Sequence, residues 1–186
     1  FALASWRVHA TESQVVREEI TIGGPGGNIS ALRFTPRDEH LNIVAVVAHG
    51  YSGSKEVMTT FCAELANQGI TAYCFDFPGH GDSDALAAGW DYDLLADALL
   101  CVADAYGATR AVGLSLGAGA LLRALTRDPR RFERLAFVLP AAIDGTRRDG
   151  ATERLRVLGD AIVAGDADAA AEFLLSELPH PVRSRR

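Results

Sequence analysis

A continuous apolar run at residues 43–48, Ile-Val-Ala-Val-Val-Ala, constrains the fold of this chain more than any other feature. Its β-branched residues favour a strand, and the lack of alternating polar residues means that both faces of the strand need cover. Strands of this kind occur in parallel sheets whose two faces are packed against helices. The run therefore predicts an α/β architecture.

The flanking segments alternate between strand and helix patterns. An N-terminal hairpin is expected first, with strands at 15–22 and 28–35 joined by a glycine-rich turn. The later elements are a helix at 55–68, a strand at 70–77, a helix at 91–106, a strand at 110–112, a helix at 116–126 and a buried strand at 135–139. In the helix at 55–68, Val57, Phe61 and Leu65 have helical spacing, and Gly69 is placed to end it. This order predicts a doubly wound, mostly parallel sheet with an N-terminal antiparallel hairpin.

The chain is expected to divide into three parts around this sheet. Residues 1–14 form an N-terminal extension, residues 15–150 the α/β core, and residues 151–186 a helical lid or cap with two short alanine-rich helices at 153–164 and 166–177. The 186 residues suffice for one domain with a substantial core but not for two ordinary domains.

The composition limits the partners and the compartment. A net charge of −6 argues against a nucleic-acid partner, which would need a basic surface, and no apolar run approaches the roughly 20 residues of a membrane span. Cys62, Cys74 and Cys101 are widely spaced and are expected to be buried thiols in a reducing compartment. No signal-peptide pattern is recognised, so a cytoplasmic protein without a metal or other cofactor is expected. Lys55 is the only lysine among 18 basic residues, a bias that we attribute to coding and not to function.

The clearest chemical signal is Gly113-Leu114-Ser115-Leu116-Gly117, which lies between a predicted strand and a predicted helix. A G-x-S-x-G pattern in this context is typical of a nucleophilic serine on a tight, strained turn. Larger residues at the two glycine positions would clash with the neighbouring strand and helix, and Gly119 and Ala120 are expected to keep the helix thin where it packs on the sheet. The alternative is an incidental serine in a glycine-rich turn.

Two further motifs follow the ends of neighbouring predicted strands. His49-Gly50-Tyr51-Ser52-Gly53 comes directly after the first parallel strand, and Asp76-Phe77-Pro78-Gly79-His80-Gly81-Asp82-Ser83 closes the next. Acyl-transfer chemistry requires backbone N–H donors aimed at the developing oxyanion. The backbone N–H groups of Tyr51 and Leu116 are expected to supply them, since one lies in the loop after the first strand and the other directly follows Ser115.

These three motifs together resemble those of the α/β-hydrolase superfamily, and they are most similar to its carboxylesterase, lysophospholipase and cinnamoyl-esterase-like members. The resemblance covers roughly residues 15–140. It implies a serine nucleophile, an acyl-enzyme intermediate, and hydrolysis or transfer of an acyl group from a carboxylic ester or thioester. A serine at position 115 argues against the dehalogenase and epoxide-hydrolase branches, whose nucleophile is an aspartate.

The catalytic base and its acid are not evident in the sequence. The family order places an acid and then a histidine after the serine, and His180 is the only histidine in that part of the chain. Asp144, which follows the strand expected at 135–139, is the best candidate for the acid. We expect instead that the sequence is an incomplete portion of a longer hydrolase whose further strand–helix units carry both residues; loss of the triad is the alternative.

Several functions fit these motifs. The leading one is a serine hydrolase acting on a small-molecule acyl ester or thioester, with an acyl-carrier protein as a second candidate for the acyl donor. An acyltransferase that passes the acyl group to an alcohol or amine has the same motifs, and a non-catalytic binding member of the fold would leave Ser115 idle. A dinucleotide-binding turn over residues 113–119 fits badly, because Ser115 occupies the second glycine position of that fingerprint.

Overall fold

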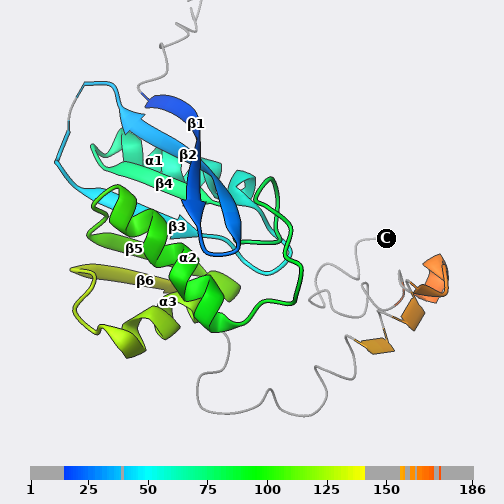
Figure 1. The fold of residues 1–186 in the computed structure, drawn as a ribbon. Helices are drawn as coiled ribbons and strands as arrows, with labels where there is room; N and C mark the ends of the chain where they lie inside the picture. The colour runs from blue at the N-terminus through cyan, green and yellow to red at the C-terminus, as the bar shows by residue number, and fades with distance from the viewer. Residues whose placement is uncertain are drawn as a thin grey trace, which may run out of the picture. The chain divides into compact units, whose positions relative to one another are not determined.

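In a computed structural model of the chain, the described residues are 15–38, 40–140, 156, 157, 160, 161, 163–169 and 172. They belong to two compact units, Phe1–Ala141 and Ala142–Arg186. The described part of the first unit contains six strands, three α-helices and one 3₁₀ helix (Figure 1). No helix in the described ranges is long and apolar enough to cross a membrane.

The six strands form one sheet in the order β1-β2-β4-β3-β5-β6. β1 (Val15–Gly24) and β2 (Gly27–Pro36) make the predicted hairpin, and β2 also pairs antiparallel with β4. The parallel strands are β4 (Thr71–Phe75), β3 (Val44–Ala48), β5 (Arg110–Leu114) and β6 (Arg134–Val138). The prediction of a doubly wound, mostly parallel sheet with an antiparallel N-terminal hairpin is confirmed.

Helices cover both faces of this sheet. They are η1 (Lys55–Met58), α1 (Thr59–Asn67), α2 (Tyr92–Ala105) and α3 (Leu116–Arg127). α2 and α3 lie on one face and α1 lies on the other (Figure 1). Successive side chains of a strand point to opposite faces, so Val46 packs in the core under α2 and α3, whereas Val47 packs in the core under α1. The apolar run at 43–48 is thus covered on both sides, as its composition predicts.

Helix α1 turns a different face to the sheet from the one that the apolar spacing suggests. Val57 and Phe61 are exposed, Leu65 is half-buried against the core, and the buried apolar side chains are those of Met58, Cys62 and Ala66. Val57 lies in the 3₁₀ turn that precedes α1 and therefore does not share the periodicity of α1. The small side chains of Cys62 and Ala66 let the helix approach the sheet closely, so tertiary packing selects their face.

The thiols of Cys62 and Cys74 are buried, as expected, and Cys101 is half-buried; all three cysteines are free. Cys62 and Cys74 belong to the core between α1 and the sheet. A hydrogen bond with the Cys74 thiol and burial both raise the pKa of Cys62, so this thiol stays protonated. The Sγ–H of Cys101 donates to the carbonyl oxygen of Gly23 at 3.4 Å.

Strand β6 is present, but it is not buried as predicted. It pairs with β5 along one side, and all five of its residues are exposed, including Phe137 and Val138 with exposed fractions of 40% and 42%. An apolar run predicts a strand whose faces are covered, and this inference fails at the edge of the described sheet.

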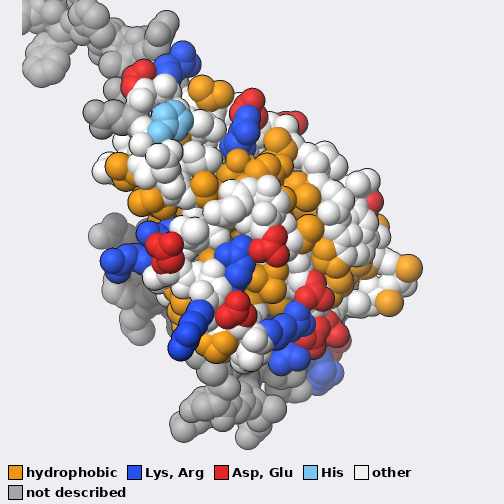
Figure 2. Space-filling view, turned by 60° about the vertical axis from the view of Figure 1, so that its left-hand side comes forward, with side chains coloured by type: hydrophobic (Ala, Val, Ile, Leu, Met, Phe, Trp, Pro, Cys, Tyr) orange, Lys and Arg blue, Asp and Glu red, His pale blue; other side chains and the backbone are white. Residues whose placement is uncertain are grey.

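Ion pairs tie α2 to α3. The guanidinium of Arg127 pairs with both Asp93 and Asp97, and that of Arg123 donates to Asp93 at 2.9 Å. Basic and acidic side chains also stand next to one another on the face shown in Figure 2. Exposed pairs of this kind are weakened by solvent, but they link α2 to α3, the helix that begins directly after Ser115.

In the second unit, the described residues 156, 157, 160, 161 and 163 are helical, and so are 167–169 and 172. These positions lie within the two helices expected at 153–164 and 166–177. The role of this segment as a lid stays a prediction, as does the N-terminal extension at 1–14, which lies outside the described residues.

Candidate active site

Ser115 occupies a strained turn between β5 and α3. Its φ of +51° and ψ of −103° lie in a region that residues with a side chain rarely adopt. Its backbone N–H donates to the carbonyl oxygen of Val138 at 2.9 Å, which joins the turn to the end of β6. The side chain is half-buried, and among the described residues no hydrogen bond engages its hydroxyl. This is the strand-to-helix geometry that the G-x-S-x-G motif predicts.

The glycines on either side of Ser115 are required by close backbone contacts. A Cβ on Gly113 would lie 2.4 Å from the carbonyl oxygen of Gly117, and a Cβ on Gly117 would lie 2.6 Å from the carbonyl oxygen of Ala48 in β3. Both contacts are far inside van der Waals distance, so the predicted clash with the helix and the neighbouring strand is confirmed. Glycine is required at position 119 for a different reason from the one expected. A Cβ there would lie 2.4 Å from the ring of Tyr92 in α2, and the sheet is not its nearest neighbour.

The loop that follows β3 lies directly against this turn. The N–H of Gly117 donates to the carbonyl oxygen of His49 at 3.1 Å, and a Cβ on Gly50 would lie 3.5 Å from the Cβ of Ser115. Tyr51, the next residue, is therefore brought beside the serine. Within the part of the chain that the structure describes, the backbone N–H groups of Tyr51 and Leu116 donate to no hydrogen bond. Both groups are thus available to an incoming acceptor.

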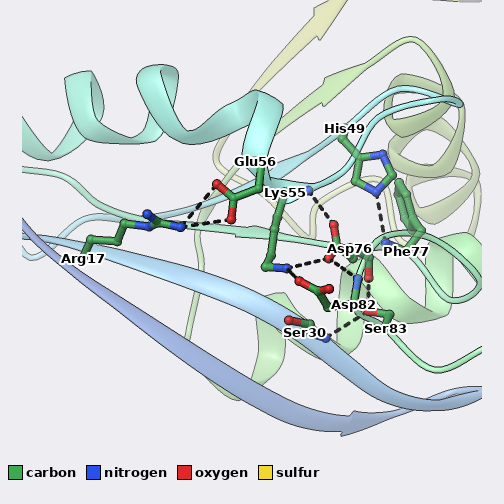
Figure 3. A network of polar contacts seen from close by, with 9 residues as sticks. All are labelled: Arg17, Ser30, His49, Lys55, Glu56, Asp76, Phe77, Asp82 and Ser83. Carbon is green, nitrogen blue, oxygen red and sulfur yellow. Dashed lines mark hydrogen bonds and ion pairs between the residues drawn. The ribbon is translucent and has the colours of Figure 1, made fainter.

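His49 is fully buried, and both of its ring nitrogens are occupied. Nδ1 lies 2.7 Å from the carbonyl oxygen of Gly50. Nε2 accepts a hydrogen bond from the N–H of Phe77 at 3.1 Å (Figure 3). The ring is therefore neutral with its proton on Nδ1, which donates to Gly50. Burial lowers the pKa of His49 from its ordinary value, although the hydrogen bond with Gly50 acts in the opposite direction.

The lowered pKa of His49 predicts that acid destabilises the fold. In the unfolded chain His49 regains its ordinary pKa of about 6.5, so its contribution is complete above that pH and is lost as the pH falls toward the lower folded value. We expect the free energy of unfolding to decrease between pH 7.5 and 5.5, by at most about 1.4 kcal/mol per pH unit from this group. Urea unfolding at the two pH values measures it. His49→Gln retains an acceptor for Phe77 but no titrating ring, so equal pH dependence in both proteins would contradict the assignment.

Behind the loop, Lys55 and two carboxylates form a polar network (Figure 3). The ammonium of Lys55 donates to Asp76 at 2.8 Å and to Asp82 at 2.5 Å, and the Lys55 backbone N–H donates to the other oxygen of Asp76 at 2.5 Å. The side chains of Lys55 and Asp76 are 3% and 0% exposed, whereas that of Asp82 is 80% exposed. Burial by itself would lower the pKa of Lys55, but the hydrogen bonds to Asp76 and Asp82 outweigh it and raise that pKa. The ammonium is therefore charged, and it joins the 49–55 loop to the loop after β4.

The loop after β4 is held in turn by the N-terminal hairpin. The Asn28 backbone N–H donates to the Asp84 carboxylate at 2.8 Å, and the Ser30 N–H donates to the Ser83 hydroxyl at 2.9 Å. That hydroxyl donates to the carbonyl oxygen of Asp76 at 2.7 Å. The second strand of the hairpin thus supports the loop that supports the Ser115 site.

The described residues assemble Ser115, Tyr51 and Leu116 in one place, but they do not supply a complete triad. Asp144 and His180, the sequence-based candidates for the acid and the base, lie outside the described residues. The Lys55 network was not predicted from the sequence, where the only signal for it is that a chain otherwise using arginine carries one lysine.

Known proteins resemble this chain in sequence and in fold. A family model described as serine aminopeptidase, S33, matches residues 39–164. A comparison with curated proteins finds no match.

Solved structures of hydrolases have a similar fold. The chain is similar to an esterase from Exiguobacterium antarcticum, with a TM-score of 0.67, 22% identity, and coverage of 89% of this chain and 65% of that one. It is similar to a carboxylesterase from Bacillus subtilis, with a TM-score of 0.64, 21% identity, and coverage of 78% and 51%. An α/β serine hydrolase without a lid from Xanthomonas campestris gives a TM-score of 0.59, 25% identity, and coverage of 75% and 67%. The chain thus spans between half and two thirds of the length of these proteins.

Proposed function

Because the chain belongs to the serine aminopeptidase S33 family and has the α/β-hydrolase fold, we propose that it is a serine hydrolase acting on carboxylic esters or thioesters, with Ser115 as its nucleophile. The observation that carries this proposal is the backbone of Ser115. A residue with a side chain is held at a φ of +51° between β5 and α3, flanked by two backbone N–H groups without a partner among the described residues. Strain of this kind persists where the surroundings enforce it, and it clusters at functional sites.

The proposed reaction begins when the Oγ of Ser115 attacks the acyl carbonyl carbon, forming an O–C bond while its proton passes to a base. The carbonyl electron pair moves onto oxygen, and the N–H groups of Tyr51 and Leu116 donate to this oxyanion. Collapse of the intermediate expels the alcohol or thiol, which takes up the proton, and leaves an acyl-enzyme. Water then adds to the acyl carbon and releases the carboxylic acid and Ser115.

The start of α3 favours this charge distribution. The N–H of Leu116 is among the first of the helix, which have no partner within the helix, and the helix N-terminus carries a partial positive charge. Removing a single oxyanion donor typically costs about 10²–10³ in kcat. The two N–H groups therefore account for a large share of the rate that we expect from this site.

Two related activities share the acyl-enzyme step. An acyltransferase would pass the acyl group to an alcohol or amine, and a thioester donor could arrive on an acyl-carrier protein. An aminopeptidase, the activity in the family description, would cleave an amide. Assays with a naphthyl ester, an acyl thioester and an aminoacyl anilide, each with and without an added alcohol acceptor, separate these activities.

A fluorophosphonate probe tests the proposal most directly. The serine displaces fluoride and forms a stable Oγ–P bond, which requires an activated hydroxyl. Cleavage after Arg110 and Arg123 gives a peptide, residues 111–123, that contains a single serine, so the adduct maps without ambiguity.

We expect one adduct per native molecule, on that peptide, and none after unfolding in urea. The intact mass of the labelled native protein, compared with that of the 186-residue chain, also tells whether the base lies within these residues. A native protein that takes up no probe would contradict the proposal and favour a binding member of the fold with an idle serine.

A further inference from the structure

The oxyanion loop, residues 49–53, needs support from outside because it has few anchors of its own. The Tyr51 side chain is 66% exposed, and glycines stand at positions 50 and 53. Glycine allows a peptide unit to rotate at little cost. The direction of the Tyr51 N–H is set by the peptide unit that joins Gly50 to Tyr51, whereas the position of the Tyr51 Cα depends on both peptide units that meet there.

The first of these peptide units is held from within the loop. In a trans peptide the C=O and the N–H point in opposite directions, so the carbonyl of Gly50 fixes the direction of the Tyr51 N–H. That carbonyl accepts from Nδ1 of His49 at 2.7 Å and from the N–H of Gly53 at 3.0 Å.

The second peptide unit is held by a histidine from another loop. Nε2 of His80 lies 3.0 Å from the carbonyl oxygen of Tyr51, and its Nδ1 lies 3.3 Å from the carbonyl oxygen of Pro78. A neutral imidazole has one N–H to give, and the shorter contact is the one to Tyr51. Both partners are carbonyl oxygens, which can only accept hydrogen bonds. Nε2 must therefore carry a proton if His80 is to hold the Tyr51 carbonyl.

The ring of His80 is itself held in place. Its centroid lies 5.3 Å from that of His49, 6.3 Å from that of Tyr51 and 6.4 Å from that of Trp90. The backbone N–H of His80 donates to the carbonyl oxygen of Phe77 at 2.9 Å. Since the Lys55 network and the hairpin fix the same loop, His80 reaches Tyr51 from a rigid support.

We propose that His80 is a positioning residue of the oxyanion hole, whose Nε2–H holds the Tyr51 carbonyl so that the Tyr51 N–H stays aimed at the reacting oxygen. This inference rests on the proposed function, because it gives His80 a role only if the Tyr51 N–H binds an oxyanion. Loss of the hydrogen bond between His80 and the Tyr51 carbonyl leaves the substrate contacts and Ser115 in place. It therefore lowers kcat and leaves KM nearly unchanged.

Two amide side chains of different reach separate this role from a purely structural one. The amide nitrogen of glutamine can occupy the place of Nε2, whereas that of the shorter asparagine occupies the place of Nδ1. His80→Gln retains the bond to Tyr51, and His80→Asn retains only the bond to Pro78. We expect kcat to fall about tenfold in His80→Asn, less than for outright removal of a donor, and to stay within about threefold of the unmodified protein in His80→Gln.

The readouts are kcat and KM on an ester, and the ³¹P chemical shift of the Ser115 phosphonyl adduct, whose P–O oxygen occupies the oxyanion position. In His80→Asn we expect the shift to move toward that of the unfolded adduct. The same two substitutions at the exposed His40 serve as controls and should leave both readouts unchanged.

The outcomes distinguish the two proposals. If the unmodified protein takes up no fluorophosphonate probe, the proposed function is overturned. A labelled protein in which His80→Asn has an unchanged kcat and ³¹P shift overturns the positioning role alone. If His80→Asn retains activity and His80→Gln loses it, the positioning role is also overturned. The loss of activity is then assigned to the contact of His80 with Pro78. If His80→Asn does not fold, His80→Phe, which retains the ring contacts without a donor, takes its place with the same expected loss.

Discussion

Ser115→Ala should lower kcat for ester hydrolysis by a factor on the order of 10⁴–10⁶ without changing the melting temperature measurably. The substitution removes one oxygen atom and leaves the Cβ and the backbone as they are. No hydrogen bond among the described residues engages that hydroxyl, so its loss leaves none of them unpaired. Steady-state kinetics and thermal unfolding monitored by circular dichroism measure the two effects. Retention of more than a few per cent of the turnover would place the nucleophile elsewhere.

The same position allows a control for strain. Ser115→Gly also removes the hydroxyl, but it relieves a backbone at a φ of +51° that disfavours any residue with a Cβ. Residues in such regions cost about 1–3 kcal/mol each, part of which is offset by the greater freedom of glycine in the unfolded chain. We expect the inactive glycine variant to be more stable than the alanine variant by about 1 kcal/mol. Equal stability would mean that the turn is not strained.

Lys55→Met should destabilise the fold by about 3–5 kcal/mol, the largest effect on stability that we expect from one substitution. Asp76 is fully buried, and removal of the ammonium leaves its carboxyl group without the buried cation that pairs with it. Methionine fills a similar volume, so the loss measures the charge and not a cavity. Urea unfolding at pH 7 measures the change in the free energy of unfolding. A loss below about 1 kcal/mol would contradict the view that the pair anchors the loop.

Neighbouring residues provide matched controls. Arg17 forms a two-bond ion pair with Glu56, the residue after Lys55, but both side chains are about half exposed (Figure 3). Arg17→Met should therefore cost at most about 1 kcal/mol. Adding Asp76→Asn to Lys55→Met should recover part of the lost stability, because it removes the unpaired charge while keeping one acceptor for a backbone N–H.

The features that the sequence predicts well are those encoded locally. The hairpin, the parallel strands and the helices can be predicted from the spacing of apolar residues and from turn residues. Both signals are contained in short stretches of sequence. The strand at β6 is not buried as predicted, and apolar spacing alone does not identify the buried face of α1, because both depend on what lies across from an element. Val57 and Phe61 have the right spacing for a core, but the sheet packs against Cys62 and Ala66 instead.

The candidate site divides in the same way. Ser115 and its two glycines form a contiguous motif, and the steric reason for those glycines follows from the motif itself. Lys55 and His80 act on residues 21 and 29 positions away, through contacts that only the folded sheet creates. The single lysine was attributed to coding bias in the sequence, but its position has a physical reason in the structure. A compact ammonium fits between two carboxylates where the planar guanidinium of arginine is a poor substitute.

The burial of Lys55 also determines how this chain meets reagents and modifying enzymes. Its ammonium is the only side-chain amine in the 186 residues, and 3% of that side chain is exposed. Acylating cross-linkers, acetyltransferases and ubiquitin ligases that act on lysine therefore have one target here, and folding conceals it. They can reach it only in molecules in which Lys55 has come away from Asp76, so an amine adduct at Lys55 records how often this buried ion pair opens.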